Sequence, residues 1–229
     1  MNKKTWPASK AVSVVVDTAG WFDPFAQRLV NGLISSGHRA TLIRDYANVP
    51  AGDVAFYLSC MRITPSETLA RNERNLVVHA SDLPKGRGFS PMVWQVLEGT
   101  NQIPVTMIYM TEEVDAGEIV LQDTIFLEGH ELNDEMRNLL GNKIIEMCLQ
   151  YTNSPELPEA RPQSGESSWY PRRRPNDSQL DPHQSLAAQF ELLRVVDNER
   201  YPAFFDYRGF RYTLRIDKQG AIPTSETKG

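Results

Sequence analysis

The sequence predicts an α/β fold in which a mostly parallel sheet is covered by helices. Short β-branched, apolar runs alternate with helix-period segments over residues 12–151, a pattern typical of a parallel sheet with helices on both faces. The first run, Val12 to Val16, is almost continuously apolar, as in a strand buried on both faces. A chain of 229 residues, 41% hydrophobic and 23% charged, is long enough to bury a sizeable core.

The expected elements follow in order along the chain. We expect strands at 12–16, 40–43, 54–58, 75–79 and 105–110, and within 119–126. The first helix is expected to start with Asp23 as N-cap and Pro24 in the first turn, and to end at Gly37. Further helices are expected at 65–69, 91–98 and 132–151, the last of them long and amphipathic.

The chain divides into a main α/β domain and a smaller C-terminal part. We expect the main domain at 1–152 and a linker rich in Pro, Glu, Ser and Gln at 153–168. A small extension at 169–222 follows, with a helix near 185–195 and a β-hairpin that turns at Arg208-Gly209. Residues 223–229 are expected to fray.

Composition disfavours several classes of protein. No apolar stretch approaches the roughly 20 residues of a membrane-spanning helix, and the run after the basic N-terminus is too short for a signal peptide. We therefore expect a cytoplasmic protein that does not bind membranes. Cys60 and Cys148 lack metal or redox spacing, so we expect reduced thiols and no metal site. A formal net charge of −5 without a broad basic surface disfavours nucleic-acid binding.

Two residues are candidates for chemistry. His79 ends an apolar run before a glycine-containing loop, and ligands of such sheets bind beyond the carboxyl ends of the strands. Asp115 lies in a turn, where it either bonds its own backbone or faces His79 and favours the charged imidazolium. A structural role for His79 is also open. No nucleophile elbow or phosphate-loop motif is present, so general acid–base chemistry is favoured.

Three motifs, in the same order along the chain, resemble those of a known family. Leu58–Pro65, Val78–Pro84 and Val114–Gln122 are similar to segments of the folate-dependent formyltransferases, which include glycinamide ribonucleotide and methionyl-tRNA formyltransferases. Later segments, around Arg173–Asp181 and Tyr201–Phe205, are similar to the region after the catalytic domain of the tRNA enzyme. They are closer still to the formyltransferase that modifies a nucleotide-linked 4-amino-arabinose.

The resemblance implies a fold, a reaction and a set of site residues. The catalytic domain would be Rossmann-like, and the formyl group of 10-formyltetrahydrofolate would move to an amine through a tetrahedral intermediate. His79 would carry the proton between the amine and the folate nitrogen, and Asp115 would orient the histidine ring and favour its charged form. The family pattern assigns the folate pocket to Met61, Arg62 and Ile63, and the border of the acceptor to a loop containing Ser81, Lys85 and Arg87.

One position departs from the family pattern. The family has an Asn two residues before the histidine, where this chain has Val77. Asn75 would share a strand face with His79 but lie one step lower, about 6–7 Å further along. Because loss of one oxyanion donor costs about 10²–10³ in rate, either another donor, for example from the Ser81 loop, replaces the Asn or the site is altered or inactive.

The leading functional hypothesis is an N-formyltransferase that acts on a nucleotide-linked amino sugar in polysaccharide biosynthesis. Trp169 and Tyr170 could stack a base while the run Arg172-Arg173-Arg174 pairs with its pyrophosphate, and a solvated linker is an equally weighted interpretation. Formylation of another small amine or hydroxylamine, hydrolysis of formyl-folate, and a non-catalytic folate- or nucleotide-binding homologue are the alternatives. A homodimer that associates through the apolar hairpin or the tail is expected.

Overall fold

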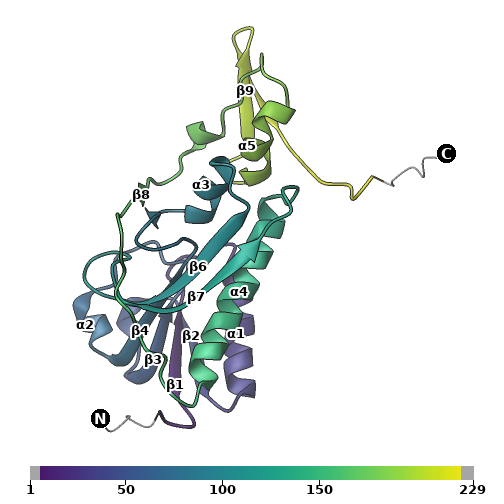
Figure 1. Ribbon diagram of the computed structural model, residues 1–229. Coiled ribbons are helices and arrows are strands. Elements are labelled where there is room, and N and C mark those ends of the chain that lie inside the picture. Colours follow the sequence, from purple (N-terminus) through teal and green to yellow (C-terminus); the bar gives the residue numbers. More distant parts are fainter. Residues whose placement is uncertain (1–5, 223–229) are drawn as a thin grey trace, which may run out of the picture.

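The computed structural model describes residues 6–222 and contains one main six-stranded sheet with the order β2-β1-β3-β4-β6-β7 (Figure 1). The strands are β1 (Ala11–Val15), β2 (Arg39–Ile43), β3 (Gly52–Tyr57), β4 (Asn72–His79), β6 (Gln102–Tyr109) and β7 (Ile119–Phe126). The first four strands pair in parallel, whereas β6 and β7 are antiparallel to their neighbours. The predicted mostly parallel α/β sheet is thereby confirmed.

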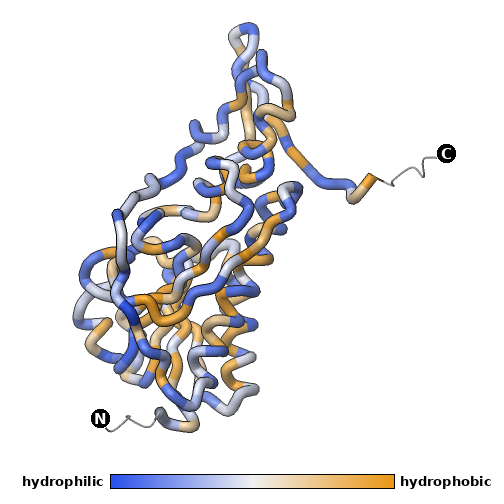
Figure 2. The backbone as a smooth tube through the Cα atoms, viewed as in Figure 1, coloured by the Kyte–Doolittle hydropathy of each residue, from blue (hydrophilic) through white to orange (hydrophobic). Residues whose placement is uncertain are grey.

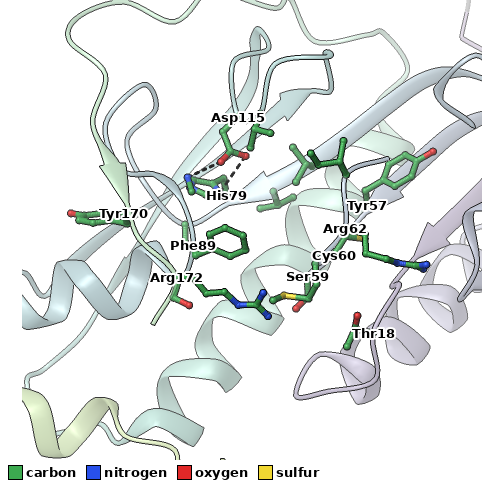
Figure 3. A pocket seen from close by; sticks show the side chains of 18 of the residues that line it. Thr18, Tyr57, Ser59, Cys60, Arg62, His79, Phe89, Asp115, Tyr170 and Arg172 are labelled. Atoms are coloured by element: carbon green, nitrogen blue, oxygen red, sulfur yellow. Dashed lines mark hydrogen bonds and ion pairs between the residues drawn. The ribbon is translucent and has the colours of Figure 1, made fainter. Parts of the chain in front are cut away.

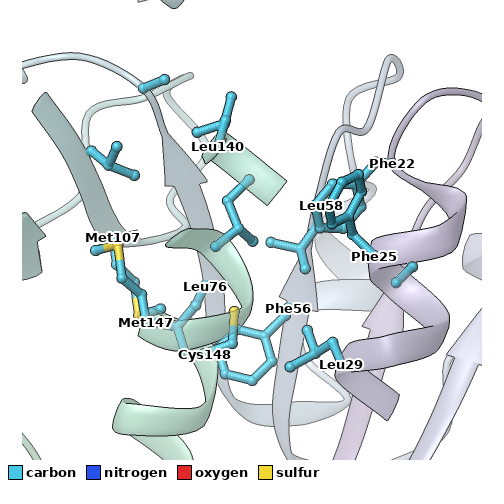
Figure 4. Close-up of a cluster of buried hydrophobic side chains, with 14 of the residues drawn as sticks. Phe22, Phe25, Leu29, Phe56, Leu58, Leu76, Met107, Leu140, Met147 and Cys148 are labelled. Atoms are coloured by element: carbon cyan, nitrogen blue, oxygen red, sulfur yellow. The ribbon is translucent and has the colours of Figure 1, made fainter. Parts of the chain in front are cut away.

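The two faces of the sheet are covered unequally. Helices α1 (Asp23–Ser35) and α4 (Asn133–Asn153) pack against each other over one face, where the largest apolar cluster includes Phe25, Leu29 and Phe56 (Figure 4). The opposite face carries a smaller cluster around Tyr46, within the short η1 (Tyr46–Asn48), and the short α2 (Ser66–Leu69) packs against it. The expectation of helices on both faces therefore holds in full for one face only.

The first helix departs slightly from its expected start. Pro24 lies in the first turn as predicted, but Asp23 is itself the first helical residue and Phe22 takes the N-cap position without a side-chain bond. The Asp23 carboxylate instead accepts a hydrogen bond from the amide of Gly20 and pairs with Arg44. Its role is therefore to fix the loop between β1 and α1.

The segment after α4 returns to the main domain. Arg161 forms an isolated bridge with Ile119, and β8 (Trp169–Tyr170) pairs in parallel with β5 (Arg87–Gly88), which precedes α3 (Pro91–Leu97). In Figure 1 this segment runs along the domain toward β8. The stretch expected as a linker is thus partly docked by backbone hydrogen bonds.

The C-terminal part forms a small outer unit. It comprises η2 (Pro175–Ser178), η3 (Ala187–Gln189), α5 (Phe190–Val195) and a hairpin of β9 (Ala203–Tyr207) and β10 (Phe210–Leu214). The hairpin and its turn confirm the sequence prediction, and it projects away from the sheet (Figure 1). Figure 2 shows mixed polar and apolar residues along this unit. The predicted fraying at 223–229 lies outside the described residues.

Two expectations from composition bear on the described part of the chain. None of the helices within residues 6–222 combines the length and apolar character needed to cross a bilayer. Cys60 and Cys148 are free thiols, with Cys148 buried in the core.

Candidate active site

A cavity of about 1340 Å³ opens beyond the carboxyl ends of β1, β3 and β4, where ligands of such sheets bind. Its walls come from the β1–α1 loop, the segment after β3, the end of β4, residues 111–116 and the β8 segment. His79 and Asp115 lie together in it, with Arg62 and Thr18 on another side (Figure 3). Residues remote in sequence therefore form one site.

His79 and Asp115 form a close, largely buried pair. The Nδ1 atom of His79 lies 3.7 Å from Oδ1 of Asp115, and the side chains are only 9% and 10% exposed. On the other side of the ring, Nε2 lies 2.8 Å from the carbonyl oxygen of Gly86. Because a carbonyl oxygen only accepts hydrogen bonds, Nε2 carries a hydrogen in this arrangement. The pair can hold an imidazolium or exchange a proton at Nδ1.

Asp115 is positioned by the conformation of its own turn and by the backbone amide of Gly88. It occupies a left-handed conformation with φ of 55°, which Asp tolerates in turns. Its Oδ2 accepts a hydrogen bond of 2.9 Å from the amide of Gly88. Sequence reasoning left open whether Asp115 bonds its own turn or faces His79, and the structure places its carboxylate beside the ring.

The valine at the family's Asn position belongs to an apolar patch. Val77 lines the cavity and packs against a small cluster of Leu83, Ile108 and Ile119. Asn75 donates from its amide to the carbonyl of Leu69 and is absent from the cavity lining. Asn75 therefore offers no donor to the site.

A second built feature holds the segment after β3. The carboxylate of Asp17 is fully buried and accepts hydrogen bonds from the amides of Met61 and Arg62 at 2.8–3.1 Å. The Tyr46 hydroxyl lies 2.9 Å from both Asp17 Oδ2 and the Arg62 carbonyl. Burial disfavours the charged carboxylate, but these hydrogen bonds outweigh it and hold the pKa of Asp17 below its ordinary value.

Met61, Arg62 and Ile63, the predicted folate residues, all line the cavity. The predicted acceptor residues lie elsewhere. Ser81, Lys85 and Arg87 are not among the residues that line it. The hydroxyl of Ser81 is buried without a partner, Lys85 is exposed, and Arg87 pairs with Glu113 at 2.8 Å. The part of this loop that does border the cavity is 88–90.

An aromatic and cationic wall completes the cavity. Arg172 lies over the ring of Phe89 at 5.5 Å, and Tyr170 stacks on Trp94 at 6.2 Å. Trp169 is 55% exposed and lines the same cavity. These side chains were predicted either to form a solvated linker or to contact a ligand, and the structure shows Trp169, Tyr170 and Arg172 among the residues that line the cavity.

Cys60 also lines the cavity but is a poor nucleophile. Burial, the largest effect, raises the pKa of its thiol to about 11, so it stays protonated near neutral pH. Within residues 6–222, no cluster of His, Cys, Asp and Glu suits a metal ion.

Sequence reasoning missed Asp17, Tyr46 and the pairing of β8 with β5. Asp17 directly follows the first strand, the same signal that singled out His79 at the end of its strand. Tyr46 and the two-residue β8 carry no comparable local pattern.

The chain is thus an α/β protein that brings a histidine and an aspartate together at the carboxyl edge of its sheet. The family model for formyl transferase matches residues 12–144, more than half of the 229-residue chain. The chain therefore belongs to the formyl transferase family, which confirms the predicted family and enzyme class.

Solved structures show the same fold. Methionyl-tRNA formyltransferase from Clostridium thermocellum shares 21% identity at a TM-score of 0.70, covering 94% of this chain and 96% of that one. A sugar N-formyltransferase candidate from Mycobacterium tuberculosis shares 17% identity at a TM-score of 0.72, and the match covers 93% of this chain and 100% of that one. HypX from Aquifex aeolicus in complex with tetrahydrofolic acid shares 16% identity at a TM-score of 0.68, and the match covers 90% of this chain and 37% of that one.

Proposed function

We propose that the protein transfers the formyl group of 10-formyltetrahydrofolate to the amine of a nucleotide-linked amino sugar. The observation that carries this proposal is the buried His79–Asp115 pair, 3.7 Å apart, inside a cavity with two differently built sides. The similarity to a sugar N-formyltransferase candidate over 93% of the chain supports a sugar acceptor.

The pair supplies the proton transfers that this reaction needs. The acceptor amine attacks the formyl carbon and forms the new C–N bond, and His79 accepts the proton that the amine loses. His79 then returns that proton to the folate nitrogen as its bond to the formyl carbon breaks. The Asp115 carboxylate stabilises the imidazolium between these steps, an interaction that is strong in a site of low solvent exposure.

The side around Met61, Arg62 and Ile63 is the proposed folate site. Asp17 fixes the backbone amides of the first two residues, so this segment presents a set geometry to a planar ring. The tetrahydrofolic acid bound to HypX, a protein of the same fold, supports a folate donor. We expect no metal in the reaction.

The acceptor is proposed to lie against the wall of Phe89, Trp169 and Arg172, with Arg200 further along the cavity. Neither Arg172 nor Arg200 forms a side-chain ion pair within the described part of the chain. Aromatic faces beside unpaired guanidinium groups suit a base and the phosphates of a nucleotide. We propose that Ser81, Lys85 and Arg87 act on the acceptor through the loop they shape.

We propose a cytoplasmic enzyme of polysaccharide biosynthesis that acts as a homodimer, with no nucleic-acid or membrane partner. The exposed hairpin residues Phe210 and Tyr212, which are 70% and 45% exposed, are the proposed dimer contact.

Mass spectrometry of product tests the proposal. Purified protein is mixed with 10-formyltetrahydrofolate and a panel of nucleotide-linked amino sugars, small amines and hydroxylamines. We expect one formyl group to be gained by a nucleotide-linked sugar. Formylation of a small amine alone, release of formate, or folate binding with no turnover would each reject the proposed acceptor. The last outcome would indicate an amine acceptor outside the panel or a non-catalytic homologue.

A further inference from the structure

One short strand holds both members of the catalytic pair. Gly86 directly precedes β5, and its carbonyl accepts a hydrogen bond of 2.8 Å from Nε2 of His79. Gly88 ends β5, and its amide donates a hydrogen bond of 2.9 Å to Oδ2 of Asp115. The relative position of the imidazole and the carboxylate therefore depends on where this strand lies.

The strand is in turn held by residues beyond the catalytic domain. Ser168 accepts hydrogen bonds from the amide of Gly86 through Oγ, at 2.9 Å, and from the amide of Arg87 through its carbonyl, at 2.9 Å. The carbonyl of Tyr170 accepts from the amide of Phe89 at 3.1 Å. All of these contacts come from a segment that lies after residue 144, where the family match ends.

Tyr170 also occupies the space next to Gly86. A β-carbon on Gly86, which has a φ of +69°, would lie 2.7 Å from the Tyr170 ring. The ring is itself fixed by a stack on Trp94 and by a hydrogen bond from its hydroxyl to Glu98. The backbone of Gly86 is therefore confined by a hydroxyl at its amide and a ring at its α-carbon.

We propose that Ser168 and Tyr170 are positioning residues that act on His79 through Gly86. The Gly86 carbonyl keeps a hydrogen on Nε2 in both protonation states of the ring, because it can only accept. The proton that His79 exchanges during turnover is therefore carried on Nδ1, the atom that faces Asp115. This assignment of the exchanging nitrogen rests on the proposed function, whereas the restraint on the ring does not.

The restraint is tested without any substrate. In protein labelled with ¹⁵N-histidine, the His79 signals, assigned with a His79→Gln variant, should show a protonated Nε2 with slow hydrogen exchange. Ser168→Ala should accelerate exchange at Nε2 at least tenfold and shift the ring signals. Ser168→Thr, which keeps the hydroxyl, should restore them. The matched control is Ser167→Ala, because Ser167 makes no side-chain hydrogen bond in the described residues.

Kinetics give a second, separate measurement. With an acceptor in hand, Ser168→Ala should lower kcat about 10- to 100-fold, since displacement of a catalytic group by about 1 Å can cost that much, and should leave the KM for folate unchanged. Unaltered His79 signals in Ser168→Ala, or equal changes in Ser167→Ala, would overturn the positioning role. Absent turnover in the wild-type protein, with His79 responding as predicted, would overturn the proposed function alone.

Discussion

His79 and Asp115 lie close enough to interact electrostatically, and both side chains are largely buried. At 3.7 Å the two groups lie within ion-pair distance but outside hydrogen-bond reach. In the proposed reaction, Nδ1 takes up a proton from the amine and the ring then attracts the carboxylate across this gap. Burial of both side chains strengthens this attraction relative to a surface pair.

The first prediction separates charge from geometry at this pair. Asp115→Asn can still accept the hydrogen bond from the Gly88 amide through its amide oxygen but carries no charge. We expect kcat to fall about 10²- to 10⁴-fold, with little change in folate binding, as measured by formylation rate and by fluorescence titration of folate. The kcat of His79→Gln should fall at least as far. Turnover within a few fold of wild type in either variant would remove the pair from the mechanism.

The second prediction concerns Asp17, whose pKa is held below its ordinary value by hydrogen bonds that exist only in the folded chain. A carboxyl with a lowered folded-state pKa contributes stability above its unfolded pKa of about 3.9 and loses it as the pH falls through the folded pKa. Asp17→Asn should therefore lower the free energy of unfolding by about 2 kcal/mol at pH 7. The difference from wild type should narrow below about pH 4.

Urea unfolding of both proteins from neutral to acidic pH measures this difference. The control is Asp134→Asn, an exposed residue of the first turn of α4, for which we expect a change of about 0.5 kcal/mol or less. A gap for Asp17→Asn that stays constant down to acidic pH would contradict the assignment of its charge as the stabilising feature.

At the scale of the elements, α1 and α4 meet through a glycine. A β-carbon on Gly141 of α4 would lie 2.4 Å from the ring of Phe25 in α1, so the helices approach closely only because Gly141 has no side chain. Gly32 of α1 faces only the flexible side chain of Leu149, at 3.3 Å. These glycines lie in interior turns of their helices but differ in what surrounds them.

The third prediction follows from that difference. Alanine favours a helix over glycine by about 1 kcal/mol, but overpacking a core costs about 1–3 kcal/mol. Gly141→Ala should therefore be destabilising by about 1–2 kcal/mol, whereas Gly32→Ala should be neutral or slightly stabilising. Thermal unfolding of the two variants measures this. Equal shifts in Tm would show that the close approach at Phe25 does not limit the packing of the two helices.

The elements that sequence predicted are those with a long, local signal. The continuous apolar run at β1 and the repeated apolar positions of α4 are visible without knowledge of their neighbours. The strands β5 and β8 have two residues each, too few to show a period of two. Their pairing depends on a return of the chain over some 80 positions, which no local pattern records.

At the scale of the whole molecule, the C-terminal unit is anchored to the main domain by a buried arginine. Arg194 of α5 is fully buried and bonds Glu131 at 3.1 Å, the Asn101 side chain at 3.0 Å, and Glu191 at 3.1 Å. Because the Arg194 side chain is fully buried, these partners compensate a charge that would otherwise be costly in the interior. This anchor keeps Asp197, Arg200 and Tyr201 at the cavity wall.

The cavity could be predicted from sequence only in part. The histidine, the aspartate and the segment after β3 follow motifs that lie close together along the chain. Trp169 and Arg172 are placed by the pairing of β8, and Arg200 by the Arg194 anchor, so their position at the cavity depends on tertiary contacts. These residues of the expected C-terminal extension thus line the cavity, which the composition of that part of the chain does not indicate.

The last prediction concerns two positively charged side chains of the cavity. Arg172 and Arg200 line the cavity and lack side-chain ion-pair partners among residues 6–222, so an anionic acceptor would supply the missing charge. Hydrogen bonds to charged groups contribute about 1.5–3 kcal/mol, which corresponds to about a 10- to 100-fold change in binding. Arg172→Gln and Arg200→Gln should each raise the KM for a diphosphate-linked amino sugar by that factor and leave the KM for folate unchanged.

Steady-state kinetics at two salt concentrations measure the effect. The matched control is Arg208→Gln at the tip of the hairpin, which lies outside the cavity lining and should leave both KM values unchanged. Because salt screens partly exposed charges, the wild-type KM for the acceptor should rise with ionic strength, and less so in the Arg172 and Arg200 variants. If both variants retained the wild-type KM and its salt dependence, the phosphates would bind elsewhere. Arg172 and Arg200 would then serve only to cover the site.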